Sequence, residues 1–297
     1  MKREPLVSII MNCHNGEKYL LYSLKSVLNQ QYKNWELIFW DNKSTDGSAK
    51  IVKNLRDKRI RYFYSSKKDV LYKARNLAIK KSKGEFIAFL DVDDMWTKDK
   101  LKLQISKLLK HKKAGLIFGN FYKFYNSDKK KIAYKNNLPE GKITNFLVKN
   151  YQVAFLTVVI RKKFLKNFKV FDYNYDLLAD YDFVLFFSIN NKFVSINKPL
   201  AYYRIHDEQL QKKEMEKQAT QFCKWFKNKN IQKKLRYYDL SRINQKYYYF
   251  YFIKNLKNLN LSLIKKTFKH LNLKNLVRII ILILFSKKLL YKFSDNV

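Results

Sequence analysis

Apolar strands and amphipathic helices alternate along the first part of this 297-residue chain. Runs typical of buried strands occupy residues 6–11, 36–40, 60–64 and 87–90, and stretches with the helical period separate them, such as residues 71–81. Strands that alternate with helices in this way indicate βαβ units. The pattern therefore predicts an α/β fold with a mostly parallel sheet flanked by helices.

Three of the predicted strands lead into a polar residue: Asn12, Asp41 and Asp91. In open α/β sheets, ligands bind beyond the carboxyl ends of the strands. We therefore expect these three side chains to converge on a ligand site at one edge of the sheet.

The strand at 87–90 is followed by three carboxylates, Asp91, Asp93 and Asp94. In extended backbone, Asp91 and Asp93 would project to the same side. Two hard oxygen ligands on one side suit a divalent cation that also holds a diphosphate. The alternative is a helix start, in which Asp94 or Thr97 caps a helix from Lys98 onward.

The charge of the chain is strongly positive, with 62 Lys and Arg against 24 Asp and Glu. Such a charge favours anionic partners: nucleic acid, anionic phospholipid or a phosphorylated carrier. A compositional bias without any such partner is the alternative. The two cysteines form neither a disulfide framework nor a metal-ligand pattern, which fits a reducing compartment.

Neither a secretory signal nor a membrane span is predicted. Residues 1–5 lead into only about five apolar residues before Asn12, too few for a signal peptide. The most apolar window, residues 276–285, is interrupted by Arg278 and is about half the length needed to cross a bilayer. We expect a cytoplasmic protein, either soluble or peripheral at the inner face of the cell membrane.

The chain is predicted to have two regions, residues 1–206 with the α/β pattern and residues 207–297 with an almost purely helical pattern. The segment from Leu271 to Tyr291 interleaves Lys and Arg with long aliphatic side chains. This pattern is typical of a helix lying on an anionic membrane. An ordinary helical subdomain is the alternative.

Six segments together carry a resemblance to a known family. They are residues 7–17, 26–32, 40–48, 74–76, 83–94 and 179–182. In this order and spacing they resemble family 2 glycosyltransferases, over roughly residues 6–206. The resemblance implies a GT-A fold, a nucleotide-diphospho-sugar donor and inversion at the anomeric carbon, with residues 207–297 as a helical extension outside the shared core.

The resemblance also implies a set of donor-binding residues. They are Asn12, Asn15, Glu17, Asp41, Asn42, Arg75 and Asp91. Asp41 and Asn42 match an acidic pair that contacts the nucleobase, where a side-chain oxygen accepts the N3–H of uracil or thymine and so favours UDP or dTDP. Asn42 stands where Asp is commoner, but its carbonyl can still accept. Arg75 would pair with the diphosphate or with a neighbouring aspartate.

The metal implied by the resemblance is Mg²⁺ or Mn²⁺. Asp93 matches the main ligand, Asp91 would contact ribose or metal, and His206 matches a position near the diphosphate that supplies a third ligand. As a Lewis acid, the ion would neutralise the departing nucleotide diphosphate.

Asp180 matches the general base of the family, which takes the proton from the acceptor hydroxyl. Ala179 replaces the first acid of the usual pair, so Asp182 remains an alternative base. Carboxylates at these positions would also suit the N-terminus of the apolar helix that follows.

Three functions remain open at this point. The first is an inverting, metal-dependent glycosyltransferase that acts on a hydroxyl of a cell-surface glycan or lipid-linked acceptor. The second, a nucleic-acid-binding protein, would use the charge and the many Tyr and Phe side chains. It leaves the ordered acidic motifs unexplained, so no nucleic-acid partner is expected. The third is a catalytically impaired homologue that still binds sugar nucleotides, suggested by Ala179 and Asn42.

Overall fold

The computed structural model describes residues 4–125, 129–165, 170–209, 214–255 and 261–284. It divides into two compact units, one made of residues 1–144 and 152–206 and the other of residues 145–151 and 207–297. The second unit thus includes residues 145–151, which the sequence pattern assigns to the first region. Residues 285–291 of the predicted membrane-binding stretch lie outside the described residues.

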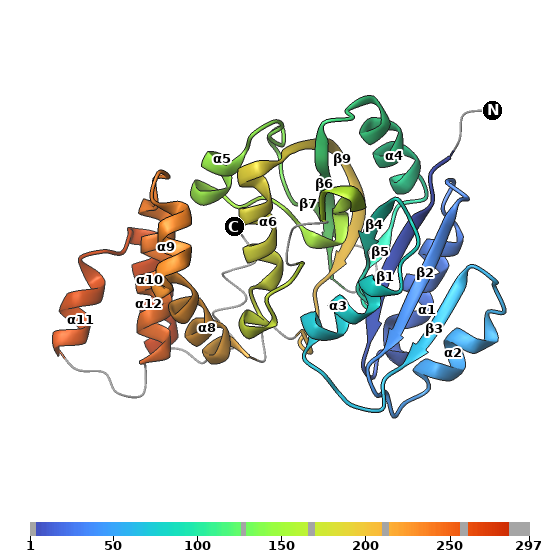
Figure 1. The fold of residues 1–297 in the computed structure, drawn as a ribbon. Helices are drawn as coiled ribbons and strands as arrows, with labels where there is room; N and C mark the ends of the chain where they lie inside the picture. Colours follow the sequence, from blue (N-terminus) through green and yellow to red (C-terminus); the bar gives the residue numbers. More distant parts are fainter. Residues whose placement is uncertain (1–3, 126–128, 166–169, 210–213, 256–260, 285–297) are drawn as a thin grey trace. The chain divides into compact units, whose positions relative to one another are not determined.

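The first unit is built on a mixed sheet in which nine strands are described, in the order β3-β2-β1-β4-β8-β6-β9-β5 with β7 beside β6 (Figure 1). The strands are β1 (Val7–Cys13), β2 (Trp35–Asp41), β3 (Ile60–Tyr64), β4 (Phe86–Phe89), β5 (Met95–Trp96), β6 (Ala114–Phe124), β7 (Lys130–Ile132), β8 (Val159–Arg161) and β9 (Lys192–Arg204). Strands β1 to β4 are parallel, so their carboxyl ends meet at one edge. The predicted parallel α/β sheet is confirmed.

The helices of the first unit follow the predicted alternation. They are α1 (Glu17–Leu28), α2 (Ser48–Asn54), α3 (Leu71–Lys80), α4 (Lys100–Lys110) and α6 (Ala179–Asn190), and α5 (Thr144–Lys149) begins at the boundary with the second unit.

The apolar stretch at residues 153–160 looks like one strand in the sequence, but the structure does not form a continuous strand there. The chain forms the 3₁₀ turn η1 (Phe155–Thr157) there, and only β8 follows as a strand. The Thr157 hydroxyl donates to the Ala154 carbonyl at 2.6 Å and accepts from the Gly119 N–H at 3.1 Å. These side-chain bonds stabilise a turn that hydrophobic patterning cannot detect.

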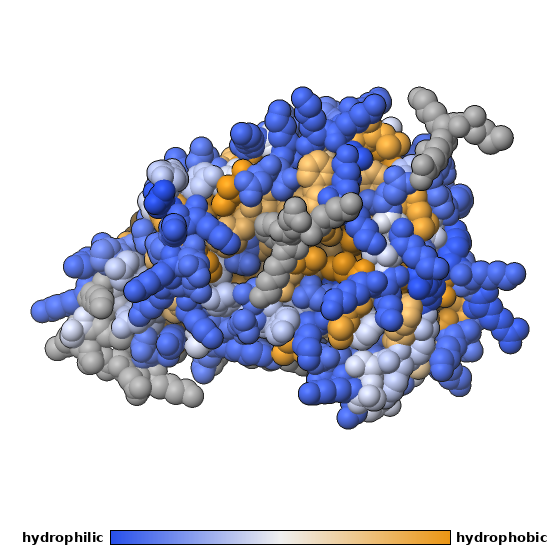
Figure 2. Space-filling view, viewed as in Figure 1, coloured by the Kyte–Doolittle hydropathy of each residue, from blue (hydrophilic) through white to orange (hydrophobic). Residues whose placement is uncertain are grey.

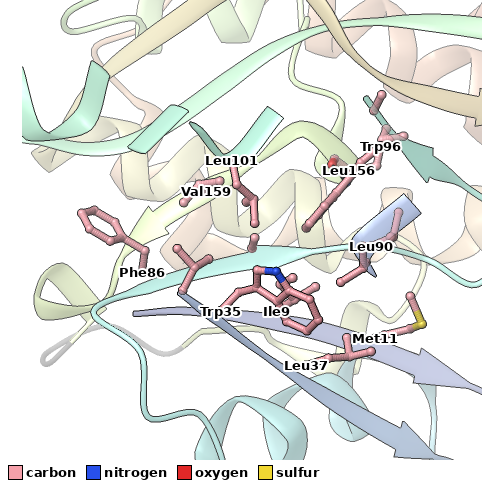
Figure 3. Close-up of a cluster of buried hydrophobic side chains, with 14 of the residues drawn as sticks. Ile9, Met11, Trp35, Leu37, Phe86, Leu90, Trp96, Leu101, Leu156 and Val159 are labelled. Carbon is pink, nitrogen blue, oxygen red and sulfur yellow. Dashed lines mark hydrogen bonds between the residues drawn. The ribbon is translucent and has the colours of Figure 1, made fainter. Parts of the chain in front are cut away.

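One face of the sheet packs against α1, α2 and α4. Because strand side chains alternate, Ile9, Met11 and Leu37 point to this face, where they meet Leu90 and, from α4, Leu101 (Figure 3). Both faces of the sheet are covered, which explains why its parallel strands read as continuous apolar runs.

The opposite face carries a cluster of aromatic rings. Phe171 lies at its centre, with ring centroids 5.9 Å from Phe89 of β4, 5.4 Å from Phe183 of α6 and 4.9 Å from Tyr72 of α3. Helices α3 and α6 therefore pack on the same face. This arrangement matters for function because each of these helices carries a predicted site residue.

The second unit is helical in its described residues, with α8 (Met215–Lys227), α9 (Lys229–Leu235), α10 (Ser241–Lys254), α11 (Leu261–Phe268) and α12 (Leu273–Leu284). Its core forms where α8 meets α10, with the rings of Phe222 and Phe250 centred 5.1 Å apart and Trp225 fully buried. None of the described helices is both long and apolar enough to cross a membrane.

Most of the protein surface visible in Figure 2 is hydrophilic, which agrees with the high charge of the chain.

Candidate active site

The three carboxylates after β4 lie in a turn. Residues 92 and 93 form its corner, and the Asp94 N–H donates to the Asp91 carbonyl at 3.2 Å. The prediction that extended backbone would send Asp91 and Asp93 to the same side is therefore wrong. The turn sends the two side chains to different partners.

Asp91 forms an ion pair with Arg75 of α3, whose guanidinium donates to Asp91 Oδ1. The Arg75 side chain is buried, and its guanidinium carbon lies 4.7 Å from the ring centroid of Tyr72 and 5.3 Å from that of Phe155. The Asp91 side chain remains 41% exposed. The buried arginine thus orients a carboxylate that a ligand can still reach.

Asp180 lies in the first turn of α6, within electrostatic reach of both members of this pair. Burial raises the pKa of Asp180, and the nearby Asp91 carboxylate raises it further. Arg75 and hydrogen bonds from Tyr72 and the Tyr181 N–H act in the opposite direction. A carboxylate with a raised pKa is a better proton acceptor than an ordinary aspartate.

Asp93 meets His206 just after β9, with 3.0 Å between Asp93 Oδ2 and His206 Nε2. Arg204 ties the two segments together: its Nε donates to the Asp93 carbonyl at 2.9 Å, and its N–H donates to Asp94 Oδ1 at 2.9 Å. Asp94 is buried, and burial and Asp93 raise its pKa well above the usual range. Asp94 therefore joins β9 to the turn and does not cap a helix; the N-cap of α4 is Asp99.

The Asp93–His206 pair has a spacing that suits a divalent cation. Adjacent ligands of an octahedral ion at about 2.1 Å lie about 3 Å apart, close to the separation of Asp93 Oδ2 and His206 Nε2. In the described part of the chain, no three His, Cys, Asp or Glu side chains are arranged to hold a metal. Of the three predicted ligands, Asp93 and His206 come together, whereas Asp91 turns to Arg75.

The loops after β1 and β2 are joined by their own polar side chains. Asn15 Oδ1 accepts the Thr45 N–H at 2.8 Å, and Glu17 Oε2 accepts the Gly47 N–H at 2.8 Å. In return, Asp46 Oδ2 accepts the Glu17 N–H at 2.9 Å. The predicted donor-binding residues Asn15 and Glu17 thus satisfy backbone groups of the neighbouring loop.

Asp41 and Asn42 likewise have partners within the protein. Asp41 is buried, and its two oxygens accept from the Ser44 N–H at 2.7 Å and the Tyr62 hydroxyl at 2.6 Å. The Asn42 amide donates to the Asp69 carbonyl at 2.7 Å and accepts the Asp69 N–H at 3.0 Å. Asn42 thereby fixes the segment that leads into α3.

Asn12 is in a different situation from the other donor-loop residues. Both polar atoms of its amide are buried and have no hydrogen-bond partner in the described residues. Trp40, its register neighbour on β2, has a buried indole N–H that also lacks a partner. Unsatisfied buried groups are rare in native proteins, so a ligand or ordered water is expected to complete them.

The site also contains residues that sequence reasoning missed. Tyr72 approaches Asp180, Arg204 holds the carboxylate turn, and Asp176 Oδ1 accepts the Tyr72 N–H at 3.0 Å. Asp176 thereby caps α3, whose own N-cap residue, Val70, has no side-chain acceptor. The sequence does show that Val70 cannot cap a helix with its side chain. Nothing in the sequence, however, indicates that Asp176, about a hundred residues away, takes that role.

Comparison with known proteins now identifies the family. The family model described as Glycosyl transferase family 2 matches residues 8–171, more than half of the chain. The chain belongs to glycosyltransferase family 2. The predicted family is therefore confirmed, and with it glycosyltransferase activity.

Two curated relatives of this glycosyltransferase are informative. WfgD of Escherichia coli, named UDP-Glc:alpha-D-GlcNAc-diphosphoundecaprenol beta-1,3-glucosyltransferase, is 37% identical over 194 residues, which cover 65% of this chain and 73% of WfgD. TuaG of Bacillus subtilis, named a putative teichuronic acid biosynthesis glycosyltransferase, is 33% identical over 162 residues, which cover 54% of this chain and 64% of TuaG.

Solved structures support the same fold. S. aureus TarS 1-349 in complex with UDP superposes with a TM-score of 0.61 at 20% identity, covering 86% of this chain and 76% of that one. The mannosyltransferase PcManGT from Pyrobaculum calidifontis, solved with GDP-Man and Mn²⁺, gives a TM-score of 0.59 at 12% identity, with 89% and 79% covered. The predicted GT-A fold is confirmed.

Proposed function

We propose that this glycosyltransferase moves a sugar from a nucleotide-diphospho-sugar to a hydroxyl of a lipid-linked glycan, with inversion at the anomeric carbon. The similarity to WfgD supports this substrate class, because that enzyme's name specifies UDP-Glc and a diphosphoundecaprenol-linked acceptor. A lipid-linked acceptor would bring the protein to the inner face of the cell membrane as a peripheral enzyme.

The donor nucleotide would lie over the carboxyl ends of β1 and β2, and UDP or dTDP is the expected class. The unpartnered amide of Asn12 supports a ligand here, since a base edge or an ordered water would supply its missing bonds. Asn15, Glu17, Asp41 and Asn42 would line this part of the site and keep its loops in shape.

A Mg²⁺ or Mn²⁺ ion would be held by Asp93 and His206, with Asp91 facing the ribose or the diphosphate. Two protein ligands suffice when substrate phosphate and water complete the shell, as is common for Mg²⁺. When bound, the ion would neutralise the charge that develops on the departing nucleotide diphosphate. Arg75 would keep Asp91 oriented for this contact.

Asp180 would act as the general base. It would take the proton of the acceptor hydroxyl as that oxygen attacks the anomeric carbon from the face opposite the diphosphate. The bond from this carbon to the β-phosphate oxygen would break as the glycosidic bond forms, so the configuration inverts. The raised pKa of Asp180 and its bonds from Tyr72 and Tyr181 support this role.

The observation that carries the proposal is the meeting of Asp180 with Asp91 and Arg75 at the edge where β1, β2 and β4 end. Separate elements bring these charges together: α6 carries Asp180, α3 carries Arg75, and Asp91 follows β4. Clustered charged groups with perturbed pKa values are typical of active sites.

The test is a transfer assay with the full chain, a soluble GlcNAc-diphospho-lipid analogue and a panel of UDP-, dTDP- and GDP-sugars, with Mn²⁺ or with a chelator. We expect transfer from a UDP- or dTDP-sugar, inversion of the anomeric configuration in the product, and loss of transfer with chelator. Retention of configuration would refute the inverting mechanism, and full activity in chelator would refute the metal site. Donor binding without transfer to any acceptor would instead indicate a catalytically impaired homologue. If the protein neither bound nor used a donor but shifted nucleic acid in a salt-sensitive gel assay, the nucleic-acid alternative would be supported.

A further inference from the structure

Helix α12 (Leu273–Leu284) in the second unit presents an apolar stripe to solvent. Leu273, Val277 and Ile280 are 77%, 45% and 46% exposed. Their spacings of four and three residues put them on one face of the helix. Ile279, which points elsewhere, is fully buried, so α12 is anchored in the unit while no described residue covers the stripe.

Cations flank the apolar stripe on one side. Lys274 and Arg278 each follow a stripe residue by one position, about 100° around the helix. Arg242 of α10 joins them: burial lowers the pKa of Lys274, and the charges of Arg278 and Arg242 lower it further. None of these three cations forms an ion pair with a described residue, so the group is a cluster of like charges that an external anion would stabilise.

The charge of the region limits which partner can cover this surface. Residues 207–297 contain 21 basic and 6 acidic residues. A second copy of the chain would bring two positive surfaces together, which is unfavourable. A nucleic acid would satisfy the cations but leave the stripe in water. An anionic bilayer provides both an acyl region for the aliphatic side chains and phosphates for the cations.

We propose that Leu273, Val277 and Ile280, with Lys274, Arg278 and Arg242, form a docking surface for an anionic phospholipid bilayer. Helix α12 lies in the interface plane, with its stripe among the upper acyl chains and its cations at the lipid phosphates. The inference rests on the proposed function only in that a lipid-linked acceptor requires access to such a bilayer. It gives the protein a membrane contact that involves no spanning helix.

The test is flotation of the full chain with phosphatidylcholine vesicles that contain or lack phosphatidylglycerol. The wild-type chain should float with the anionic vesicles and stay in solution with the neutral ones. The triple variant L273Q/V277Q/I280Q keeps a good helix former at each position. It should bind the anionic vesicles at least about tenfold more weakly than the wild type. The double variant K274Q/R278Q should lose about fivefold per cation, and this loss should shrink at high salt.

Matched controls come from the first unit. Leu109→Gln and Ile132→Gln replace apolar side chains of comparable exposure, and Lys112→Gln with Lys113→Gln removes the same charge from an exposed loop. These variants should float like the wild type. Equal flotation of the triple variant, or equal losses in the controls, would overturn the proposal. The proposal would also fail if the wild type bound equally well with and without phosphatidylglycerol. It would fail too if sedimentation showed self-association of the wild type that the triple variant abolishes.

Transfer to a soluble acceptor analogue separates this proposal from the proposed function. The stripe variants should keep the wild-type rate with the soluble analogue but lose rate on acceptor embedded in anionic vesicles. If no variant, including the wild type, transfers sugar while the flotation pattern holds, the docking surface stands and the proposed reaction fails.

Discussion

The loops after β1 and β2 differ from the turn after β4 in how their polar side chains are used. Asn15, Glu17 and Asn42 bind backbone groups of neighbouring segments, and Asp41 is buried with both oxygens occupied. By contrast, Asp91 and Asp93 of the turn and Asp180 of α6 face other charged side chains and stay partly exposed.

The difference teaches that matching a family motif does not assign a single role. Hydrogen bonds to backbone N–H groups stabilise a loop whether or not a ligand is present. Carboxylates that lie close together in a partly exposed site repel one another, which costs stability. Such clusters are typical of active sites. Substitutions should therefore reduce turnover in the second region and stability in the first.

The largest effect is expected for Asp93→Ala. Loss of a metal ligand should lower kcat/KM by about 10⁴-fold, because the charge on the departing diphosphate loses several kcal/mol of stabilisation. Chemical denaturation should show little change, since the Asp93 side chain is 29% exposed and, among the described residues, bonds only His206. If the loss of unfolding free energy were as large as the rise in the activation free energy, Asp93 would act mainly in stability, like the side chains of the loops after β1 and β2.

Asp99→Ala is the matched control for Asp93→Ala. This carboxylate also has a basic partner, Lys198, but lies at the start of α4, away from the turn. Its removal should leave kcat/KM within a factor of two. A comparable loss would mean that the transfer rate reports general damage to the fold.

The next effect is that of Asp180→Asn, which keeps the shape and removes the base. We expect kcat to fall about 10³-fold with KM for the donor nearly unchanged, because proton removal occurs only in the transition state. Asp182→Asn, two residues along α6, is the control and should retain most activity. If Asp182→Asn proves the slower enzyme, the assignment of the base must be exchanged.

Asp41→Ala tests the stability side of the comparison. It removes a buried carboxylate that accepts from the Ser44 N–H and the Tyr62 hydroxyl, so the free energy of unfolding should drop by about 3 kcal/mol. Tyr62→Phe removes only one of these bonds and should cost about 1 kcal/mol. Unchanged stability combined with a large rise in donor KM would instead favour the nucleobase contact.

Much of the architecture could be predicted from local patterns. The parallel strands can be recognised in the sequence as apolar runs. Because the carboxyl ends of such strands share one edge of an open sheet, the sequence also predicts that the strand ends meet near Asp91. Asp180 and His206 were found only through the family resemblance, because they reach the site on α6 and after β9, and no local periodicity encodes those paths.

The remaining features depend on contacts between distant segments. Asp91 and Asp93 were expected on one side because the strand was extrapolated past its end, where the chain turns instead. The pairing of Asp176 with the start of α3 and the tie from Arg204 to the turn join segments far apart in sequence. Such contacts have no signature in residue spacing.

A smaller loss of stability than that of Asp41→Ala is expected at Asn42, where a single atom tests the comparison. The family resemblance leads us to expect Asp where this chain has Asn42, but the Asn42 amide donates to the Asp69 carbonyl while its oxygen accepts the Asp69 N–H. A carboxylate could keep only the second bond and would face the carbonyl with like charge. Asn42→Asp should therefore cost about 1.5 kcal/mol of unfolding free energy, although it introduces the residue expected from the family resemblance. Asn34→Asp, which alters an exposed amide bonded to the Glu4 carbonyl, should change far less in the same denaturation measurement. A more stable Asn42→Asp protein would show that the segment before α3 is held by something other than this amide.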